Sequence, residues 1–372
     1  MNDERPSLPL ASILLFPLLM IPTVMAATAN PDQAGVVLPS ETCRGLIIVP
    51  VTLSEREGGT LDLLLDTGSS WTFIDPGALR RILGRETRAG KASFKGGRIG
   101  RHELGPLQAL VLPMKTLSRV LGREIDGILG FPAFRDVLLT LDYPAEEVRV
   151  SAGSLPRPDG REIFRALGSK RPHLEVDVGG HRVKLLLDSG SNGRFLLNPT
   201  DRLTWSVGPR PAIVSVGVGV VDVDRGGRLD SAIQFGPLRF ENPVVIVRNT
   251  RERLAGWHVL RHFVLTFDQK KKRIRMQPSR TTPVRMAPLV RIGLADEPRP
   301  EGLRIIKVFP GTSAEAAGLR EGDLIVAIDG IPVHERGCGD PQGDPAGQRQ
   351  VLSYLRDGVR AEAEVETEAL VP

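Results

Sequence analysis

The stretch LLLDTGSS at residues 63–70 returns almost unchanged as LLLDSGSN at residues 185–192. The two aspartates, Asp66 and Asp188, are separated by 122 residues (188 minus 66). A second block repeats in the same order, because residues 130–142 align without gaps to residues 256–268 at a spacing of 126. Two blocks at nearly equal spacing indicate the duplication of one unit of about 120 residues.

The composition and the pattern of each unit favour β structure. Each unit contains an apolar run, the Asp-[Thr/Ser]-Gly-Ser loop, another apolar run, a glycine-rich hairpin region, and a short helix followed by strands. The chain has 40 glycines and 30 prolines but only 2 tyrosines and 3 tryptophans, a balance typical of short strands and many turns. We therefore expect a mainly β fold.

The 372 residues suffice for two or three domains. The sequence predicts a signal peptide at 1–29, a first unit at 30–155 and a polar linker containing proline and glycine at 156–170. It predicts the second unit at 171–286 and a compact C-terminal domain at 287–372.

The N-terminal segment has the features of an export signal. Residues 8–27 are apolar, and Ala27-Thr28-Ala29 supplies the small residues of a cleavage site. We therefore expect an exported protein, periplasmic or secreted. Asp3 and Glu4 are atypical of a signal peptide, so an uncleaved segment that anchors the protein to a membrane is the alternative.

Charge and cysteine content exclude several classes of partner. Residues 30–290 carry a net charge of +12 (39 basic minus 27 acidic), but their densest basic run, 270–273, lacks interleaved aromatics, so we expect no nucleic acid partner. Cys43 and Cys338 form no metal-binding spacing, and they are either one long-range disulfide or two free thiols. We expect no metal and no cofactor.

The repeated aspartates indicate acid and base chemistry, although a single such triplet would also suit an ordinary β-turn. If the two units pack about a pseudo-twofold axis, their equivalent loops meet at that axis. Asp66 and Asp188 would then lie side by side, and because two like charges about 3 Å apart cannot both ionise, they would share one proton. One carboxylate can take a proton from water while the other hydrogen-bonds a substrate carbonyl, which is an arrangement for amide hydrolysis.

The residues after each aspartate are expected to support the pair. The glycines let the backbone turn tightly, and the first hydroxyl residue of each loop can cross-link the two loops. The following serine could hydrogen-bond an outer carboxylate oxygen and lower its pKa, which predicts an acidic pH optimum. These supporting residues are Thr67, Gly68 and Ser69 in the first loop and Ser189, Gly190 and Ser191 in the second.

At these residues the sequence resembles the aspartic proteases, in particular retropepsin-like bacterial members with two lobes on one chain. The segments Ile128-Leu129-Gly130 and Leu254-Ala255-Gly256 extend the resemblance, which covers residues from about 45 to 278. It implies two duplicated β-barrel lobes about a pseudo-twofold axis, with an interlobe cleft for a polypeptide substrate. It also implies Asp66 and Asp188 as the catalytic dyad. Two features depart from it: Ser189 stands where threonine is commoner, and no flap tyrosine is evident.

The resemblance to the aspartic proteases also implies two flaps that close over an extended peptide. The glycine-rich stretches near Ser93–Gly100 and Ser215–Gly219 are the expected flaps.

The C-terminal part reads as a small α+β domain. The pattern predicts a short helix within residues 311–319, an amphipathic helix through 352–355 and a closing strand over 359–365. Residues 308–325 resemble the central motif of PDZ domains. By that resemblance Ile292, Gly293 and Leu294 form a carboxylate-binding loop for a peptide ligand that adds as a strand. A structural cap on the second unit is the alternative.

Taken together, the sequence predicts an exported aspartic-type endopeptidase, a hydrolase that acts on peptide bonds and carries a PDZ module. The rival hypothesis is a non-catalytic peptide-binding scaffold that keeps the bilobal protease fold. A third hypothesis is self-processing within the linker at 156–170.

Overall fold

The computed structural model describes residues 35–54, 59–84, 90–168, 170–217, 220–339 and 343–372. The predicted signal peptide, residues 1–29, lies outside these ranges. Among the described helices, none combines the length and apolar character needed to cross a membrane.

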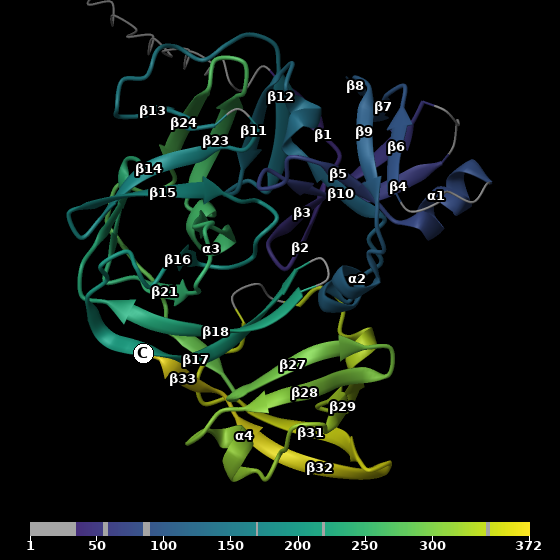
Figure 1. Ribbon diagram of the computed structural model, residues 1–372, viewed down its shortest axis with the longest axis vertical. Coiled ribbons are helices and arrows are strands. Elements are labelled where there is room, and N and C mark those ends of the chain that lie inside the picture. Colours follow the sequence, from purple (N-terminus) through teal and green to yellow (C-terminus); the bar gives the residue numbers. More distant parts are fainter. Residues whose placement is uncertain (1–34, 55–58, 85–89, 169, 218–219, 340–342) are drawn as a thin grey trace, which may run out of the picture. The chain divides into compact units, whose positions relative to one another are not determined.

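The first unit forms a sheet in the order β6-β9-β5-β10-β4-β3-β7-β8, with β2 also paired to β3 (Figure 1). Its strands are β2 (Glu41–Cys43), β3 (Leu46–Leu53), β4 (Thr60–Asp66), β5 (Thr72–Ile74), β6 (Gly90–Phe94), β7 (Gly97–Ile99), β8 (His102–Leu104), β9 (Leu107–Val111) and β10 (Gly127–Gly130). Two helices interrupt the sequence of strands: α1 (Pro76–Leu83) lies between β5 and β6, and α2 (Lys115–Leu121) lies between β9 and β10.

The second unit repeats this plan in the order β17-β18-β21-β16-β22-β15-β14-β19-β20-β25. Its strands are β14 (His173–Val178), β15 (His181–Leu187), β16 (Phe195–Leu197), β17 (Trp205–Gly217), β18 (Val220–Leu229), β19 (Ile233–Phe235), β20 (Leu238–Glu241), β21 (Val244–Val247), β22 (Leu254–Ala255) and β25 (Val284–Arg285). A short helix, α3 (Trp257–Leu260), follows β22.

A third sheet joins the two units, in the order β1-β12-β11-β23-β24-β13. Its strands are β1 (Val36–Leu38), β11 (Leu138–Asp142), β12 (Glu147–Ser151), β13 (Ile163–Arg165), β23 (Phe263–Asp268) and β24 (Arg273–Pro278), and the 3-10 turn η2 (Phe131–Phe134) precedes β11. Strand β11 of the first unit pairs antiparallel with β23 of the second, and Thr140 lies opposite Thr266 with their hydroxyl oxygens 3.0 Å apart. Because these threonines are themselves 126 residues apart, a pseudo-twofold axis passes between them.

Alternation along β4 and β15 explains why these strands are central. Leu63, Leu65, Leu185 and Leu187 are fully buried in one continuous apolar core. Burying a leucine side chain contributes about 1.5–3 kcal/mol. The buried leucines therefore fix the two strands that end at the aspartates.

The C-terminal domain has a sheet in the order β27-β28-β29-β31-β32, while β30 pairs with β29, and a separate ribbon of β26 and β33 (Figure 1). These elements are β26 (Leu289–Arg291), β27 (Leu294–Arg299), β28 (Gly302–Val308), α4 (Ser313–Ala316), β29 (Leu324–Ile328), β30 (Ile331–Pro332), η3 (Val333–Glu335), β31 (Arg349–Arg356), β32 (Val359–Glu366) and β33 (Glu368–Val371). The ribbon packs on the second unit, since Leu289 and Val371 share an apolar cluster with Ala212 of β17.

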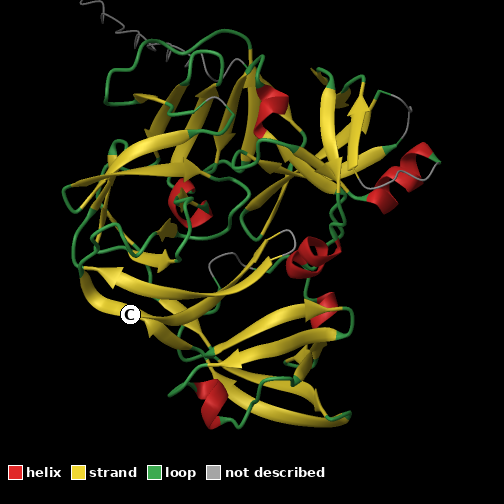
Figure 2. Ribbon diagram, viewed as in Figure 1, coloured by secondary structure: helices red, strands yellow, loops and turns green. Residues whose placement is uncertain are grey.

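The expectation of a mainly β fold is confirmed, as the few short helices in Figure 2 illustrate. The predicted closing strand over 359–365 lies within β32. The predicted helix through 352–355 is wrong, because these residues lie in β31, paired with both β29 and β32. A short apolar run has no decisive period, and its two strand neighbours settle its structure.

Two further segments differ from the sequence-based picture. The expected linker, residues 156–170, contains β13, which pairs with β24. The expected first flap, Ser93–Gly100, is largely built into the sheet, because β6 pairs with β9 and β7 pairs with β3 and β8. The second, Ser215–Gly219, is at the end of the β17–β18 hairpin, and its last two residues lie outside the described ranges.

Candidate active site

The two Asp-[Thr/Ser]-Gly loops meet and are tied together by reciprocal hydrogen bonds. The Thr67 hydroxyl donates to the carbonyl oxygen of Leu187 at 2.7 Å, and the Ser189 hydroxyl donates to that of Leu65 at 2.8 Å. The Thr67 amide donates to Ser189 Oγ at 2.9 Å, and the Ser189 amide donates to Thr67 Oγ1 at 3.0 Å. Both hydroxyl residues are buried away from water. An unpaired polar group there would lower the stability of the fold, so these hydrogen bonds fix the two loops. The cross-linking role expected for Thr67 and Ser189 agrees with this geometry.

Each carboxyl group lies against the glycine of the opposite loop. A β-carbon built on Gly68 would be 2.4 Å from Asp188 Oδ1, and one built on Gly190 would be 2.4 Å from Asp66 Cγ. The Gly190 amide also donates to Asp188 Oδ1 at 3.0 Å. The structure thus brings together Asp66 and Asp188, which are 122 residues apart, and only residues without side chains fit between them.

Strand pairing beside each loop holds the aspartates in place. In the first unit β10 runs parallel to β4, so that Gly130 lies opposite Asp66. In the second unit β22 runs parallel to β15, and the Asp188 amide donates to the carbonyl of Ala255 at 3.0 Å. The apolar-apolar-Gly segments named in the sequence analysis belong to these two supporting strands: Gly130 is the last residue of β10, and Gly256 directly follows β22.

The carboxyl groups affect each other's ionisation. Burial raises the pKa of Asp188 well above its usual value, and the negative charge of Asp66 raises it further. Burial also raises the pKa of Asp66, while a hydrogen bond with Asp188 and the amides of Gly68 and Ser69 oppose that rise. The positive charge of Arg171 lowers the pKa of both. A pair of this kind retains one proton at a pH where isolated aspartates have lost theirs.

The serines that follow the glycines do not do what the sequence predicted. Ser69 Oγ donates to the carbonyl of Trp71 at 2.6 Å and accepts from its amide, and Ser191 Oγ accepts from the Gly193 amide at 3.2 Å. Both side chains therefore close their own turns instead of bonding the outer carboxylate oxygens. A serine hydroxyl readily reaches the backbone two residues ahead, and this local bond prevails here.

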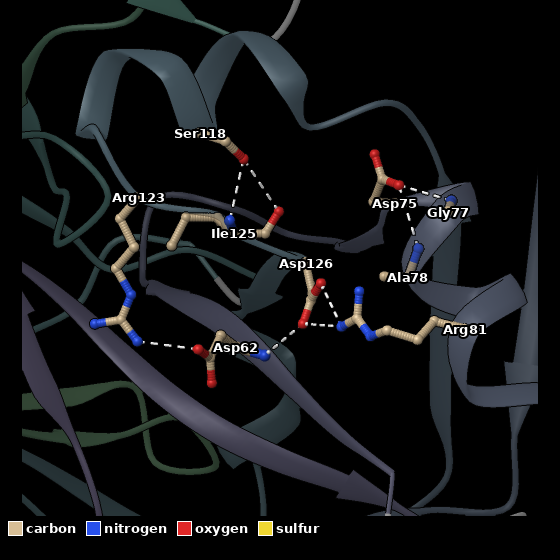
Figure 3. Close-up of polar contacts among 9 residues, drawn as sticks. All are labelled: Asp62, Asp75, Gly77, Ala78, Arg81, Ser118, Arg123, Ile125 and Asp126. Carbon is tan, nitrogen blue, oxygen red and sulfur yellow. Dashed lines mark hydrogen bonds and ion pairs between the residues drawn. The ribbon is translucent and has the colours of Figure 1, made fainter. Parts of the chain in front are cut away.

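A polar network fixes the helices beside the first loop (Figure 3). Asp75 caps α1 by accepting from the amides of Gly77 and Ala78. Asp126 accepts from the Asp62 amide of β4 at 3.0 Å and from Arg81 of α1 at 2.8 Å. These contacts tie α1 and the segment before β10 to the strand that carries Asp66, so the network supports the loop from outside the dyad.

The predicted PDZ loop lies between β26 and β27 and is held against α4. The carbonyl of Ile292 accepts from the Ala314 amide at 2.9 Å, and that of Gly293 accepts from the Phe309 amide at 2.8 Å. Gly293 has a φ of +94°, a value that favours glycine, and a β-carbon there would meet Thr312 at 2.1 Å. Leu294 is the first residue of β27, which is one of the two edge strands of the domain's sheet.

Sequence reasoning left the cysteines open and gave Tyr143 no role. Cys43 and Cys338 form a disulfide between β2 and the C-terminal domain, with a Cα–Cα distance of 4.9 Å. A chain with two cysteines permits one disulfide, but their positions in the sequence do not show whether they pair. A cavity of about 420 Å³ lies beside this disulfide, and its lining includes Arg44, Tyr143, Trp257 and Cys338.

The described residues also bear on two other kinds of catalytic centre, a metal site and a histidine–serine pair. Within the described ranges, no group of three or more histidine, cysteine, aspartate or glutamate side chains is arranged to hold a metal ion. Across those same residues no side-chain hydrogen bond joins a histidine ring to a serine hydroxyl; the His173 ring bonds Glu252 at 2.9 Å and the carbonyl of Arg171 at 3.2 Å.

Comparison with known proteins bears on the C-terminal domain. Residues 304–340 match the sequence profile of the PDZ domain family. The chain therefore contains a PDZ domain. A curated protein of Synechocystis sp., named "Putative serine protease HhoA", is 50% identical over 38 residues, which is 10% of this chain and 10% of that protein. The chain thus shares a short segment with that relative, and the PDZ match lies outside both aspartate loops.

Two solved structures show weaker similarity. One is an aminopeptidase N family protein from Idiomarina loihiensis, with 25% identity over 22% of this chain and 14% of that chain. The other is a PDZ domain protein from Parabacteroides distasonis, with 22% identity over 22% of this chain and 21% of that chain. Both have a TM-score of 0.20, which is too low to show a shared fold.

Proposed function

We propose that this protein is an aspartic-type endopeptidase, in which Asp66 and Asp188 activate water to hydrolyse peptide bonds. The observation that carries the proposal is the packing of each carboxyl group on the opposite loop's glycine, within a lattice of four hydrogen bonds between Thr67, Ser189 and the two strands. A turn that merely linked strands would need no such matched contact.

In the proposed reaction the pair holds one proton. The ionised carboxylate takes a proton from a water molecule as that water attacks the peptide carbonyl carbon, and the protonated carboxyl group donates to the carbonyl oxygen. Collapse of the tetrahedral intermediate breaks the C–N bond, and the amine leaves with a proton returned by the pair. Each proton taken is given back, so the pair ends the cycle in its starting state.

The PDZ domain supports a peptide as the substrate class. PDZ domains bind peptides by adding a strand to a sheet edge, and β27 is such an edge strand. The named relative adds a second, weaker argument for a peptidase, although it is described as a serine protease. Among the described residues no histidine ring hydrogen-bonds a serine hydroxyl, whereas the aspartates are paired, which favours the carboxylate mechanism.

We also propose that the protein is exported to the periplasm or secreted. The support is the apolar segment at 8–27 and the disulfide between Cys43 and Cys338, a bond that persists in oxidising compartments. Cell fractionation with and without residues 1–29 tests this; an oxidised, processed protein in the cytoplasm would contradict it.

The test of the activity is cleavage of a peptide library from about pH 3 to 8 by residues 30–372, the range over which a carboxylate pair titrates. Asp66→Asn and Asp188→Asn should each abolish cleavage while keeping the folded state. Asp357→Asn is the matched control, because this exposed aspartate has a φ of 50°, which asparagine tolerates, in the turn between β31 and β32. If all four proteins fold and are equally inert, the non-catalytic peptide-binding scaffold becomes the better account.

A further inference from the structure

Arg194 is a buried arginine that the proposed reaction does not use. It is 6% exposed, and in the described part of the chain no carboxylate hydrogen-bonds it. Its Nη1 donates to the carbonyl of Ala287 at 2.9 Å, and its Nη2 donates to that of Pro288 at 3.0 Å. Burial, together with the positive charges of Arg291 and Arg228, lowers the pKa of Arg194 to about 10. A buried cation without an acidic partner is unfavourable, so this position requires an explanation.

The turn that follows each aspartate loop is closed in the same way in both units. In the first unit the Trp71 amide donates to Ser69 Oγ at 3.3 Å. In the second unit the Gly193 amide donates to Ser191 Oγ at 3.2 Å. Gly193 is therefore the equivalent of Trp71, at a spacing of 122 (193 minus 71).

The strands that follow these turns are separated by one residue more. Phe73 of β5 lies opposite Ile128 of β10. Leu196 of β16 lies opposite Leu254 of β22. The two partner residues are equivalent in the duplication, so Leu196 is the equivalent of Phe73, at a spacing of 123 (196 minus 73). The second unit thus has one extra residue between the turn and the strand, and Arg194 is that residue.

The backbone of Arg194 closes the second aspartate loop. Its carbonyl accepts from the Gly256 amide at 3.2 Å, and the Asp188 amide donates to the carbonyl of Ala255 at 3.0 Å. Both ends of the loop are therefore bonded to two adjacent residues of one segment. In the first unit the amide equivalent to that of Gly256 donates instead to the Thr72 hydroxyl at 3.3 Å, and no extra residue is needed there.

The side chain of Arg194 joins this loop to the segment that enters the C-terminal domain. Residues 287 and 288 directly precede β26, and the predicted carboxylate-binding loop at 292–294 follows β26. Arg228 of β18 bonds the same segment, since its Nη2 donates to the carbonyl of Met286 at 3.3 Å. Of these two arginines, Arg194 is the one that ends an aspartate loop, and its planar guanidinium bonds two carbonyls at once.

We propose that Arg194 is a positioning residue, through which the segment entering the C-terminal domain fixes the second aspartate loop and keeps Asp188 packed against the first loop. The activity part of this inference rests on the proposed function, whereas the placement of Asp188 is measured without activity. The proposal explains why the extra residue is a buried arginine, because the second unit is the one that continues into the C-terminal domain.

The direct test is the ionisation of Asp188 in Arg194→Met, in which an unbranched apolar side chain replaces the guanidinium and both donors are lost. Burial is the main cause of the raised pKa of Asp188, so a loosened loop that admits water should lower this pKa. Loss of a positive charge alone would raise the pKa, so the direction of the change identifies its cause. 13C NMR of labelled aspartate carboxyl groups measures it, and Asp188→Asn assigns the signal.

Two further variants control for charge and for folding. Arg228→Met removes a cation and a bond to the same segment but no contact of the aspartate loop, so the pKa of Asp188 should stay unchanged. Arg194→Lys keeps the charge but lacks the guanidinium fork, so the pKa should fall less than in Arg194→Met. Thermal unfolding checks that each variant folds, and the lysine variant carries the test if the methionine variant does not fold.

The pH profile of kcat/KM gives a second readout. A lower pKa of Asp188 should move the alkaline limb of the Arg194→Met profile to lower pH, because the pair is active while it holds one proton. We also expect kcat to fall about tenfold, which is less than the loss of about 100-fold for a catalytic group displaced by about 1 Å. Arg228→Met should keep the limb and kcat of the parent.

The outcomes separate this inference from the proposed function. A lower pKa of Asp188 in Arg194→Met and Arg194→Lys, in a protein that cleaves nothing, would support the positioning role and contradict the protease. Cleavage that depends on both aspartates, with the pKa of Asp188 unchanged or raised in Arg194→Met, would overturn the positioning role alone. An equal fall in Arg228→Met would also overturn it, because any weakening of the contacts to the segment would then suffice.

Discussion

Gly68 lies so close to the carboxyl group of Asp188 that a β-carbon on the glycine would be 2.4 Å from Oδ1. Atoms at that distance overlap, so Gly68→Ala must push the aspartate or its loop aside. We expect kcat to fall about 100-fold, the effect of displacing a catalytic group by about 1 Å. Steady-state kinetics of the folded variant measure this effect.

The matched control for that substitution is Gly105→Ala. A β-carbon on Gly105 would have no atom within 4 Å, and its φ is not in the left-handed region. An unchanged kcat in Gly68→Ala, or an equal loss in Gly105→Ala, would argue against the tight packing of the dyad.

The reciprocal hydroxyl contacts make Thr67 important for stability. Thr67→Val keeps the shape of the side chain but leaves the Leu187 carbonyl and the Ser189 amide without their partner. We expect a loss of about 1–3 kcal/mol in the free energy of unfolding, the cost of unsatisfied buried groups. Thr67→Ser retains the hydroxyl and should lose less. Urea unfolding measures the stability of the two variants. A Thr67→Val variant as stable as Thr67→Ser would contradict this account.

The raised pKa values of Asp66 and Asp188 predict a specific pH dependence of stability. A carboxyl group whose pKa is higher in the folded state binds more protons there, so its contribution is favourable at low pH and is lost as the pH rises through the folded pKa. Asp188→Asn should therefore raise the free energy of unfolding at pH 7 and change it little at pH 3. Guanidinium unfolding at pH 7 and pH 3 measures these free energies. An Asp188→Asn variant less stable than the parent at pH 7 would show that the ionised pair does not destabilise the fold.

The disulfide between Cys43 and Cys338 should stabilise the folded chain by closing a loop across 295 residues of sequence. Cys43→Ala with Cys338→Ala is expected to lower the free energy of unfolding by about 2–5 kcal/mol. A reducing agent should have the same effect on the parent and none on the double variant. If reduction also destabilised the double variant, the agent would be acting elsewhere, and the measured loss could not be assigned to this bond.

The sequence was informative where chemistry is local and repeated. Asp66 and Asp188, with the glycines two residues later, could be paired because duplication and pseudo-twofold packing together bring equivalent loops to one axis. The roles of Ser69 and Ser191 could not be predicted. Whether each hydroxyl bonds the carboxylate or the backbone of its own turn depends on small differences in loop geometry, which the sequence does not show.

Contacts between residues far apart in the sequence were harder to predict. The pairing of Cys43 with Cys338 and the placement of Tyr143 depend on how the C-terminal domain and the interlobe sheet pack, which no local pattern encodes. The strand at 352–355 was mistaken for a helix because its four residues have no clear period, and its structure is set by β29 and β32 on either side.

The central claim is that Asp66 and Asp188 act as one titrating unit, and 13C NMR of labelled aspartate carboxyl groups tests it most directly. The two signals are assigned by their loss in Asp66→Asn and Asp188→Asn. We predict that in the parent the two ionisation steps are well separated, the second clearly above the usual aspartate range, and that replacing Asp66 lowers the pKa of Asp188 because the like charge is gone. Two carboxyl groups that titrate independently near pH 4, unaffected by each other's replacement, would contradict the account.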